Sequence, residues 1–500
     1  MKRISTLLLS AAMLFGTVGA AQAVDIKAKG QFEFVFGWGK NLGGSKGFNS
    51  NAAHQDFIAR QRVRTQVNFI ASEFLQGVLM FEIGDTDWGR TRNGNTGPSS
   101  GGALDADGVN VETKRAYIDW IVPNTDLSIR MGIQGLALPS ATRFNNPVFD
   151  ADVAAITASY KFNDMFALTG FWARPFDAYN DRYADNGNGR RLDDSVDMFG
   201  LVAPITGEGW ALTPWTVMAN IGNQSGYAEY IMAKDNLNGL GRGIRDVEND
   251  RAFAWWLGTG FELTMFDPLT FGMDVMYGRM GDLEGLNVGA RPDGVANPDN
   301  NFTARARGWF LDARLDYKLD WATAGIFGWW STGDDAEDQR YDANGNMTHA
   351  KLGRMPVVGV DTGFAPTSFG FSGTKTRGDD NAVSQTGMGT WGIGVQLADM
   401  SFIDDLKHTL RVSYYKGTND RDLARGDGPF GSNTRYGVDS LYLTTGDAAW
   451  EVNFDHQYKI YENLTAYLEL GYINLDLIKN HFQSDSDDAW KAQVGFKYEF

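Results

Sequence analysis

Apolar and polar residues alternate along much of this chain. In residues 26–38 every even position is apolar or glycine, whereas Lys27, Gln31 and Glu33 are among the odd positions. Residues 490–500 repeat the pattern, with aromatic or aliphatic residues at the even positions. Side chains of an extended strand point alternately to its two faces, so each segment predicts a strand with one apolar and one polar face.

The same alternation predicts strands along the whole chain. They cover 26–38, 57–69, 74–83, 110–122, 126–134, 153–162, 165–174, 195–203, 211–222, 251–264, 268–280, 305–319, 321–331, 389–398, 406–417, 448–457, 462–475 and 490–500. This is about eighteen strands, or about sixteen if the weaker segments merge. After residue 23 no run is long and apolar enough for a membrane-spanning helix, which excludes a helical membrane protein.

The connections alternate between short and long. Short ones, such as 72–73 and 123–125, are followed by long ones, such as 84–109, 135–152 and 332–388. Turns on one side and long loops on the other are typical of outer-membrane barrels. We therefore predict an all-β fold, a transmembrane antiparallel β-barrel with short periplasmic turns and long extracellular loops. A barrel of this strand number is wide enough to enclose an aqueous channel.

Residues 1–23 have the features of an export signal. They begin with two basic residues, continue with an apolar run at 7–18 and end on Ala-Gln-Ala, a site of the kind that signal peptidase cleaves. We expect this segment to be removed, leaving residues 24–500 as a single barrel domain in the bacterial outer membrane. The sequence has no cysteine, which excludes disulfides and thiolate metal ligands.

Acidic residues outnumber basic ones, and the formal net charge is −17. This balance argues against nucleic acid as a partner. Many of the acids gather in segments 334–338, 379–380 and 485–488. These segments could bind divalent cations together with lipopolysaccharide, although a solvated acidic loop is the commoner interpretation of such a run. No other cofactor is expected.

The export signal, the paired strands, the long loops and the aromatic end together resemble a bacterial trimeric porin. The start Val24-Asp25-Ile26-Lys27-Ala28-Lys29-Gly30 and the layout of the chain resemble the homotrimeric porins of sulfate-reducing bacteria. The resemblance implies a homotrimer in contact with outer-membrane lipid and lipopolysaccharide. It also implies passive diffusion of small hydrophilic solutes through the barrel. The aromatic end at Phe496, Tyr498 and Phe500 is similar to the signal that barrel assembly machinery reads.

In general porins the third long loop folds into the barrel and constricts it. Here that loop is 135–152, and its candidate residues are Arg143, Asn145, Asn146, Asp150 and Asp152. The acidic signature common in such loops is missing, so the resemblance is weaker at this point.

A porin constriction loop faces a basic wall across the pore. The corresponding residues here would be Arg60, Arg62, Arg64, Arg115 and Arg130, each of which alternates with apolar residues and is expected to point inward. Opposed charges across a narrow pore would create a transverse field that orients dipolar solutes. Because the loops are acidic and the wall is basic, we expect only a weak cation preference.

Two alternatives keep the barrel but change its interior. The arginines could pair locally with Glu82 and Asp119 and leave another loop to set the pore size. The channel could also select one solute class, sugars or organic acids. A sugar track would need stacked tryptophans, for which the candidates are Trp88, Trp210, Trp255, Trp256, Trp329, Trp330 and Trp391. Adjacent tryptophans point to opposite faces of a strand, however, which argues against such a track.

An outer-membrane hydrolase is a further alternative. It would need a serine and a histidine that meet across neighbouring strands, and His408 or His456 with Ser413 are the candidates. The chain contains no nucleophile elbow and no Gly-rich phosphate loop in the required context. We therefore predict that the protein is not an enzyme.

Overall fold

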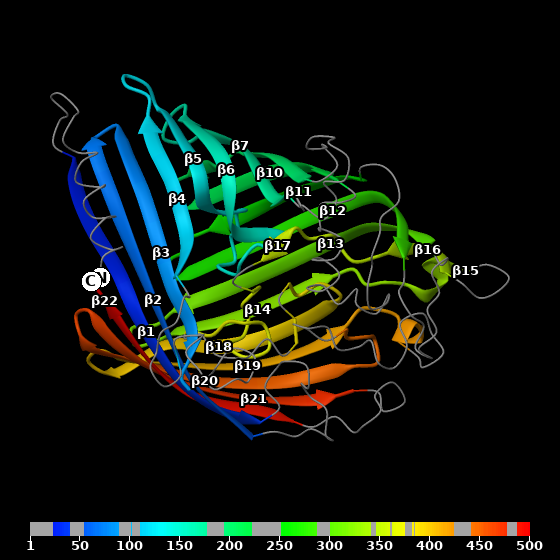
Figure 1. Ribbon diagram of the computed structural model, residues 1–500. Coiled ribbons are helices and arrows are strands. Elements are labelled where there is room, and N and C mark those ends of the chain that lie inside the picture. Colours follow the sequence, from blue (N-terminus) through cyan, green and yellow to red (C-terminus); the bar gives the residue numbers. More distant parts are fainter. Residues whose placement is uncertain are drawn as a thin grey trace.

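The computed structural model describes residues 24–40, 55–89, 102, 111–177, 195–222, 252–287, 301–341, 347–360, 363–375, 383–384, 386–424, 442–477 and 488–500. Within these residues the fold is all-β (Figure 1). Strand β1 (Asp25–Lys40) pairs antiparallel with both β2 (Gln55–Ser72) and β22 (Ala489–Glu499), so the sheet closes into a barrel. The predicted export signal, residues 1–23, lies outside the described residues.

The wall of the barrel continues from β2 to β22 through neighbouring antiparallel strands. These are β3 (Leu75–Asp87), β4 (Val111–Ile121), β5 (Leu127–Ala137), β6 (Phe149–Lys161), β7 (Ala167–Asp177), β8 (Ser195–Val202), β9 (Ile205–Gly207), β10 (Trp210–Ile221), β11 (Ala252–Leu263), β12 (Leu269–Asn287), β13 (Asn301–Lys318), β14 (Thr323–Ser331), β18 (Thr390–Ile403), β19 (Leu406–Gly417), β20 (Ala448–Tyr461) and β21 (Leu464–Asp476). Strands β8 and β9 pair with successive parts of β10 and together count as one strand of the barrel. The barrel therefore has 18 strands.

Shorter elements lie beside the wall or inside it. Strand β15 (Gln339–Tyr341) pairs with β16 (Met347–Leu352), which adds in parallel to the start of β13. Strand β17 (Gly359–Val360) pairs in parallel with the start of β6. The 3₁₀ turns η5 (Ala336–Asp338) and η6 (Arg421–Ala424) follow β14 and β19. None of the helices in the described part of the chain is long and apolar enough to cross a membrane.

The strand prediction is confirmed in number and in position. The segment predicted at 406–417 has the bounds of β19, and most of the other strands differ from the prediction by a few residues. Strands β12 and β13 are longer than predicted, since their pairing continues past two register shifts toward Asn287 and Asn301. Closure explains this regularity, because a closed sheet pairs every backbone edge that would otherwise be exposed.

The two ends of the barrel differ in their connections. Tight turns close one end, here called the turn end, and the long connections leave from the opposite, loop end (Figure 1). Both termini of the closed sheet lie at the turn end, where the backbone N–H groups of Gly30 and Phe500 each donate to the carbonyl oxygen of the other. Tyr498 and Phe500 lie beside Phe32 there, with ring centroids 6.2 and 6.0 Å from it. This places the aromatic end of the chain on the outer surface of the seam.

The outward face of the wall is apolar. Phe199, Val395 and Leu257, for example, are about half exposed on three different strands. The charged and polar residues that alternate with such residues point into the barrel, as the period of two predicts. Val494 and Gln493 on β22 illustrate the difference, because Gln493 is buried and Val494 lies on the face shared with exposed Trp490 and Tyr498.

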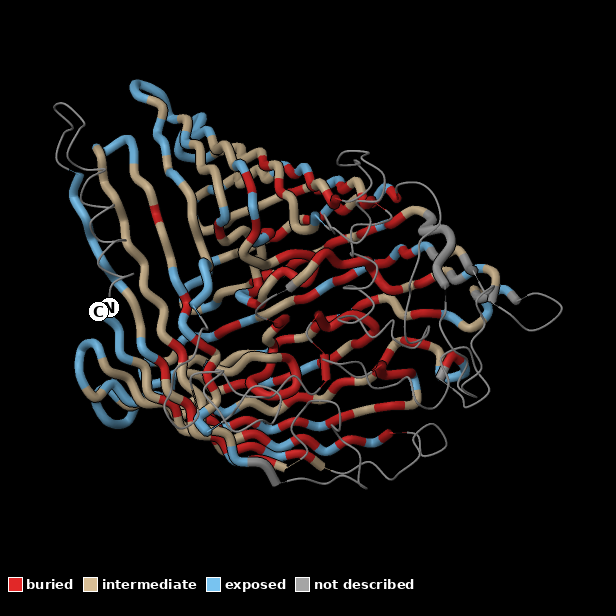
Figure 2. The backbone as a smooth tube through the Cα atoms, in the orientation of Figure 1, coloured by how far each residue is buried: buried red, intermediate tan, exposed pale blue. Residues whose placement is uncertain are grey.

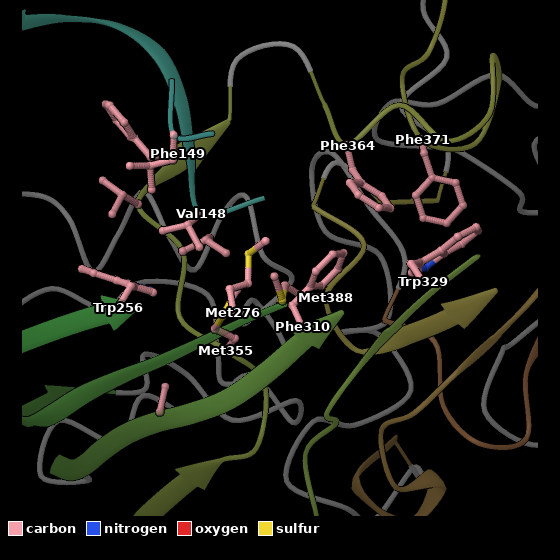
Figure 3. Packing of buried hydrophobic residues seen from close by; sticks show 14 of the residues in the cluster. Val148, Phe149, Trp256, Met276, Phe310, Trp329, Met355, Phe364, Phe371 and Met388 are labelled. Atoms are coloured by element: carbon pink, nitrogen blue, oxygen red, sulfur yellow. The ribbon is translucent and has the colours of Figure 1, made fainter. Parts of the chain in front are cut away.

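The interior is packed in the half near the loop end, where buried residues gather, whereas residues nearer the turn end are more exposed (Figure 2). Inward side chains of the wall, such as Trp256, Phe310 and Trp329, form one hydrophobic cluster with Phe364 and Phe371 from the long connection between β14 and β18 (Figure 3). Burying each of these rings contributes about 2–3 kcal/mol. The expectation of a wide, water-filled interior therefore needs correction for this half of the barrel.

Candidate functional site

Residues 138–148, here called the first inner segment, connect β5 to β6 and lie inside the barrel. They reach the opposite wall, where Asp274 on β12 accepts hydrogen bonds from Ser140 Oγ at 2.9 Å and from Ala141 N at 2.9–3.0 Å. A Cβ on Gly272 would lie 2.2 Å from the carbonyl oxygen of Ala141, so a glycine is needed for this close approach. Residues 138–148, the middle of the loop named from the sequence, thus contact the wall opposite β5 and β6.

The charges around the first inner segment are the reverse of the porin pattern. The acids Asp274, Asp312 and Asp316 lie on the wall, and the loop presents N–H and hydroxyl donors to them. Thr142 Oγ1 donates to Asp312 Oδ2 at 2.5 Å, and Arg143 Nη1 lies 3.9 Å from Asp316 Oδ2. The loop is therefore held by acids of the wall rather than offering acids to the pore.

The remaining candidate loop residues separate into two groups. Asn146 braces the loop itself, because its Nδ2 donates to Pro139 O at 2.9 Å and its Oδ1 accepts from Val148 N at 3.0 Å. Asp150 and Asp152 lie in β6, and thus in the wall. Asp152 accepts from Lys114 Nζ at 2.9 Å and from Arg115 Nε at 2.7 Å.

Residues 363–375, here called the second inner segment, also lie inside the barrel, and the buried carboxylate of Glu451 on β20 binds them. Its oxygens accept hydrogen bonds from Thr367 Oγ1 at 2.9 Å, Phe369 N at 3.1 Å and Gly370 N at 3.2 Å. Tyr415 of β19 donates its hydroxyl to the same carboxylate at 3.1 Å. A single inward acid thus fixes a turn of the segment to the wall.

Neighbouring inward residues complete the attachment of the second inner segment. Lys491 Nζ on β22 donates to Ser368 O at 2.6 Å, and Asp455 Oδ1 accepts from Ser368 Oγ at 3.2 Å. Asp455 also pairs with Arg411 at 2.8 Å. Each of these buried charged groups thus has a hydrogen-bond or ion-pair partner, as burial requires.

The two inner segments meet inside the barrel. Asn145 Nδ2 donates to Gly363 O at 2.7 Å, and Asn145 N donates to Phe364 O at 3.3 Å. The rings of Phe144 and Phe364 lie edge to face with centroids 5.5 Å apart. Together the segments contact inward residues of β12–β14 and β19–β22, and the hydrophobic cluster that they join continues along β6 and β7.

The acidic segment 334–338 is held by ion pairs and hydrogen bonds within the chain. Asp334 is buried, pairs with Arg354 Nε at 2.9 Å and accepts from Tyr442 Oη at 3.0 Å. Asp338 pairs with Lys351 at 2.5 Å. No cluster of three or more metal-ligating side chains occurs within the described residues. Segments 379–380 and 485–487 lie outside those residues.

The arginines of β2 each meet a carboxylate of β3. Arg60 Nε lies 2.7 Å from Asp87, Arg62 Nε 2.9 Å from Asp85, and Arg64 Nε 2.5 Å from Glu82. This is the local pairing that the sequence left open as an alternative. It relieves the repulsion among arginines that stand about 7 Å apart on one face.

Further cations follow on β4 and β5. Arg130 Nε lies 2.6 Å from Asp119, and Arg115 Nε lies 2.7 Å from Asp152. In these pairs the cation is the more exposed partner, with the Arg130 side chain 39% exposed against 23% for Asp119, and the Arg115 side chain 37% exposed against 16% for Asp152. At these two pairs the charge presented to the interior is thus mainly positive.

The tryptophans do not form a track. Trp256 and Trp329 are buried, and their Nε1 groups donate to Pro356 O at 2.7 Å and to Thr390 Oγ1 at 2.9 Å. Trp255 and Trp330, their neighbours in sequence, point outward, and Trp88 packs on Phe36 of the outer face. Their ring faces are therefore not available in a row to a solute.

The histidines of the hydrolase alternative point away from the interior. His408 and His456 are cross-strand partners with their Nδ1 atoms 2.6 Å apart, on the face shared with exposed Phe454. Ser413 is buried on the inward face of β19. Residues five apart on a strand point to opposite faces, so neither histidine can activate this serine.

Sequence reasoning missed the residues that hold the inner segments. Asp274, Asp312, Glu451 and Lys491 follow the inward period of their strands, but so does any residue that faces a water-filled lumen. The pattern Phe364, Phe369, Phe371 in a long connection was the available signal, because a solvated loop has little need of three phenylalanines.

No protein-family model matches the sequence, and no curated protein matches it. Among solved structures, the chain is similar to Pseudomonas aeruginosa OpdL, with 11% identity over 95% of this chain and 99% of that chain and a TM-score of 0.48. It is also similar to OccK8 (OprE) of the same organism, at 9% identity over 95% and 98% of the two chains, with a TM-score of 0.48. A third similar structure is Pseudomonas aeruginosa OpdK with vanillate, at 9% identity over 95% and 98% and a TM-score of 0.47.

Proposed function

We propose that this protein is an outer-membrane channel that favours small organic acids over cations and sugars. The observation that carries the proposal is the inner face of β4 and β5, where Arg115 and Arg130 are each more exposed than the acid beside them. Guanidinium groups bind carboxylates through two parallel hydrogen bonds, so successive arginines offer an anionic solute successive binding positions.

The inner segments support a selective channel over a general diffusion pore. They fill the half of the barrel near the loop end with an apolar cluster, and they are fixed by buried acids on the wall opposite the arginines. A solute would then pass along the arginine-bearing side in a narrowed space. The weak cation preference expected from the sequence is replaced in this proposal by a preference for anions.

The assembly of the channel is proposed on the resemblance described above. It comprises removal of residues 1–23, insertion through the aromatic end at Phe496, Tyr498 and Phe500, and association as a homotrimer. The outward apolar face of the barrel supports the membrane location. Arg60, Arg62 and Arg64, whose charges are balanced by β3, are proposed to line the same wall. The inward-folded loop around Arg143, Asn145 and Asn146 is proposed to set its width.

Replacing Arg115 and Arg130 with glutamine is expected to shift the channel toward cations. A guanidinium about 4 Å from the solute path changes the energy of a monovalent ion by about 1 kcal/mol in water-like surroundings, which is about fivefold in permeability for each residue. The measurement is the reversal potential of single channels in planar bilayers, in gradients of potassium chloride and of sodium benzoate. Lys161→Gln, which removes an exposed cation beside a turn, is the matched control.

An unchanged reversal potential in the double variant would show that Arg115 and Arg130 do not select the solute. General diffusion would then be the better account of the channel. The same conclusion would follow if glucose and benzoate entered liposomes containing the wild-type protein at similar rates. Absence of any conductance steps would contradict the channel itself.

A further inference from the structure

Three arginines form an exposed cluster on the outer surface of the barrel near its loop end. They are Arg279 on β12 and Arg305 and Arg307 on β13, here called the outer arginine cluster. Arg279 and Arg307 are direct cross-strand partners. Their Cβ atoms are therefore about 5 Å apart, and like charges so placed destabilise a sheet.

The direction of these side chains follows from their neighbours. Tyr277 and Trp309, two residues nearer the turn end, form an aromatic row with Trp255, in which ring centroids are 4.8 and 5.3 Å apart. Trp309 is exposed, whereas Met276 and Phe310, at the alternate positions, are buried in the interior. The outer arginine cluster therefore lies on the outer surface, about 7 Å beyond the aromatic row.

Within the described residues, no carboxylate pairs with any arginine of the outer cluster. The arginines of the interior show the opposite behaviour, since Arg64, Arg130 and Arg314 each contact an acid. A chain with a formal net charge of −17 has many acids to place beside a cation. Three guanidinium groups side by side, with no acid beside them among the described residues, thus indicate a negatively charged partner from outside the chain.

The hairpin of β15 and β16 extends the same positive surface. Lys351 is the register partner of Arg305, and Arg340 is the register partner of His349. Arg340 and His349 are exposed. Lys351 is already neutralised by Asp338, so it contributes less than the arginines.

We propose that the outer arginine cluster binds the phosphate groups of an anionic lipid in the leaflet at the loop end. Aromatic rows on barrels lie at the boundary between hydrocarbon and headgroups, which places the cluster at headgroup height. Guanidinium groups bind phosphate oxygens in pairs, and the apolar band below Trp309 accommodates acyl chains. The phosphorylated glycolipid of the outer leaflet has both the phosphate groups and the acyl chains. This inference rests on the membrane location proposed above.

The test compares lipid binding by wild-type protein, purified in neutral detergent and stripped of lipid, with binding by the R279Q/R307Q variant. Native mass spectrometry measures the bound fraction with lipopolysaccharide, with the same lipid after removal of its phosphates, and with inorganic phosphate. Loss of two arginines is expected to weaken lipopolysaccharide binding roughly 30-fold. Dephosphorylated lipid is expected to bind wild type and variant alike, and no more tightly than lipopolysaccharide binds the variant.

The control is Arg421→Gln, which removes an exposed cation elsewhere at the loop end and is expected to leave lipid binding unchanged. Equal affinity of wild type and the double variant for lipopolysaccharide would overturn the proposal. Competition by millimolar inorganic phosphate would overturn the lipid assignment in favour of a simple anion site. If the double variant does not fold, the Arg279→Gln variant gives the same comparison with an expected loss of about fivefold.

Single-channel conductance separates this proposal from the proposed function. R279Q/R307Q is expected to conduct like wild type in bilayers of neutral lipid, because both residues lie on the outer surface. If the protein bound lipid but showed no conductance, the proposed channel function would be wrong. The proposal that the outer arginine cluster binds lipid would remain.

Discussion

Replacing Glu451 with alanine is expected to release the second inner segment from the barrel wall and to enlarge the conductance of the channel. The wild-type carboxylate is fully buried and accepts from Thr367, Phe369, Gly370 and Tyr415. Alanine leaves these donors without an acceptor, at about 1–3 kcal/mol for each one that stays buried. Opening of the segment, which lets water reach the donors, avoids that cost.

Two measurements test this release. Hydrogen exchange of the amides of Phe369 and Gly370 is expected to accelerate strongly in the variant, and single-channel steps in potassium chloride are expected to grow. Glu462→Ala is the control, because it removes the same charge from an exposed turn between β20 and β21. Faster exchange without a larger conductance would show that the segment is held by Glu451 but does not narrow the solute path.

Period-two alternation was sufficient to predict the wall of the barrel. In a barrel that lies in a membrane the apolar face of each strand meets lipid, and this requirement is local to the strand. The direction of Arg60, Arg62 and Arg64 follows from the same rule. So does the rejection of His408 with Ser413, since positions five apart on one strand never share a face.

The contents of the barrel could not be predicted in the same way. Alternation predicts the same polar residue at an inward position whether that position faces water or a folded loop. The sequence therefore does not show that Glu451 and Asp274 bind inner segments. The contacts that decide between the two cases are far apart in the chain, as between Ser140 and Asp274 or Ser368 and Lys491. Only the three phenylalanines of the second inner segment indicated that it is packed.

The positions of Asp150 and Asp152 also could not be predicted from alternation. Asp150 and Asp152 were assigned to the constriction loop because they end a long connection, but pairing of β5 with β6 continues to the Ala137 and Asp150 register pair. A strand that extends past its alternating segment cannot be recognised from periodicity. Asp152 consequently balances Lys114 and Arg115 in the wall.

Replacing Val494 with arginine is expected to be the most destabilising single change on the last strand. Val494 is the register partner of Phe36 on one side and Leu468 on the other, in the middle of the outward apolar face. An arginine near the middle of the bilayer costs a barrel about 2–4 kcal/mol. The measurement is the free energy of unfolding in urea, in vesicles, followed by tryptophan fluorescence.

The choice of control depends on what fills the barrel. Alternation alone nominates Gln493, the next residue, but Gln493 is buried and donates from Nε2 to Glu469 at 2.6 Å, so arginine there would disturb a packed pair. Gln457, at an inward position of β20 near the turn end, is exposed. Gln457→Arg is therefore expected to change the unfolding free energy by less than about 0.5 kcal/mol. Equal losses at 494 and 457 would mean that the outward face does not meet lipid, because only a hydrocarbon environment penalises one arginine and accepts the other.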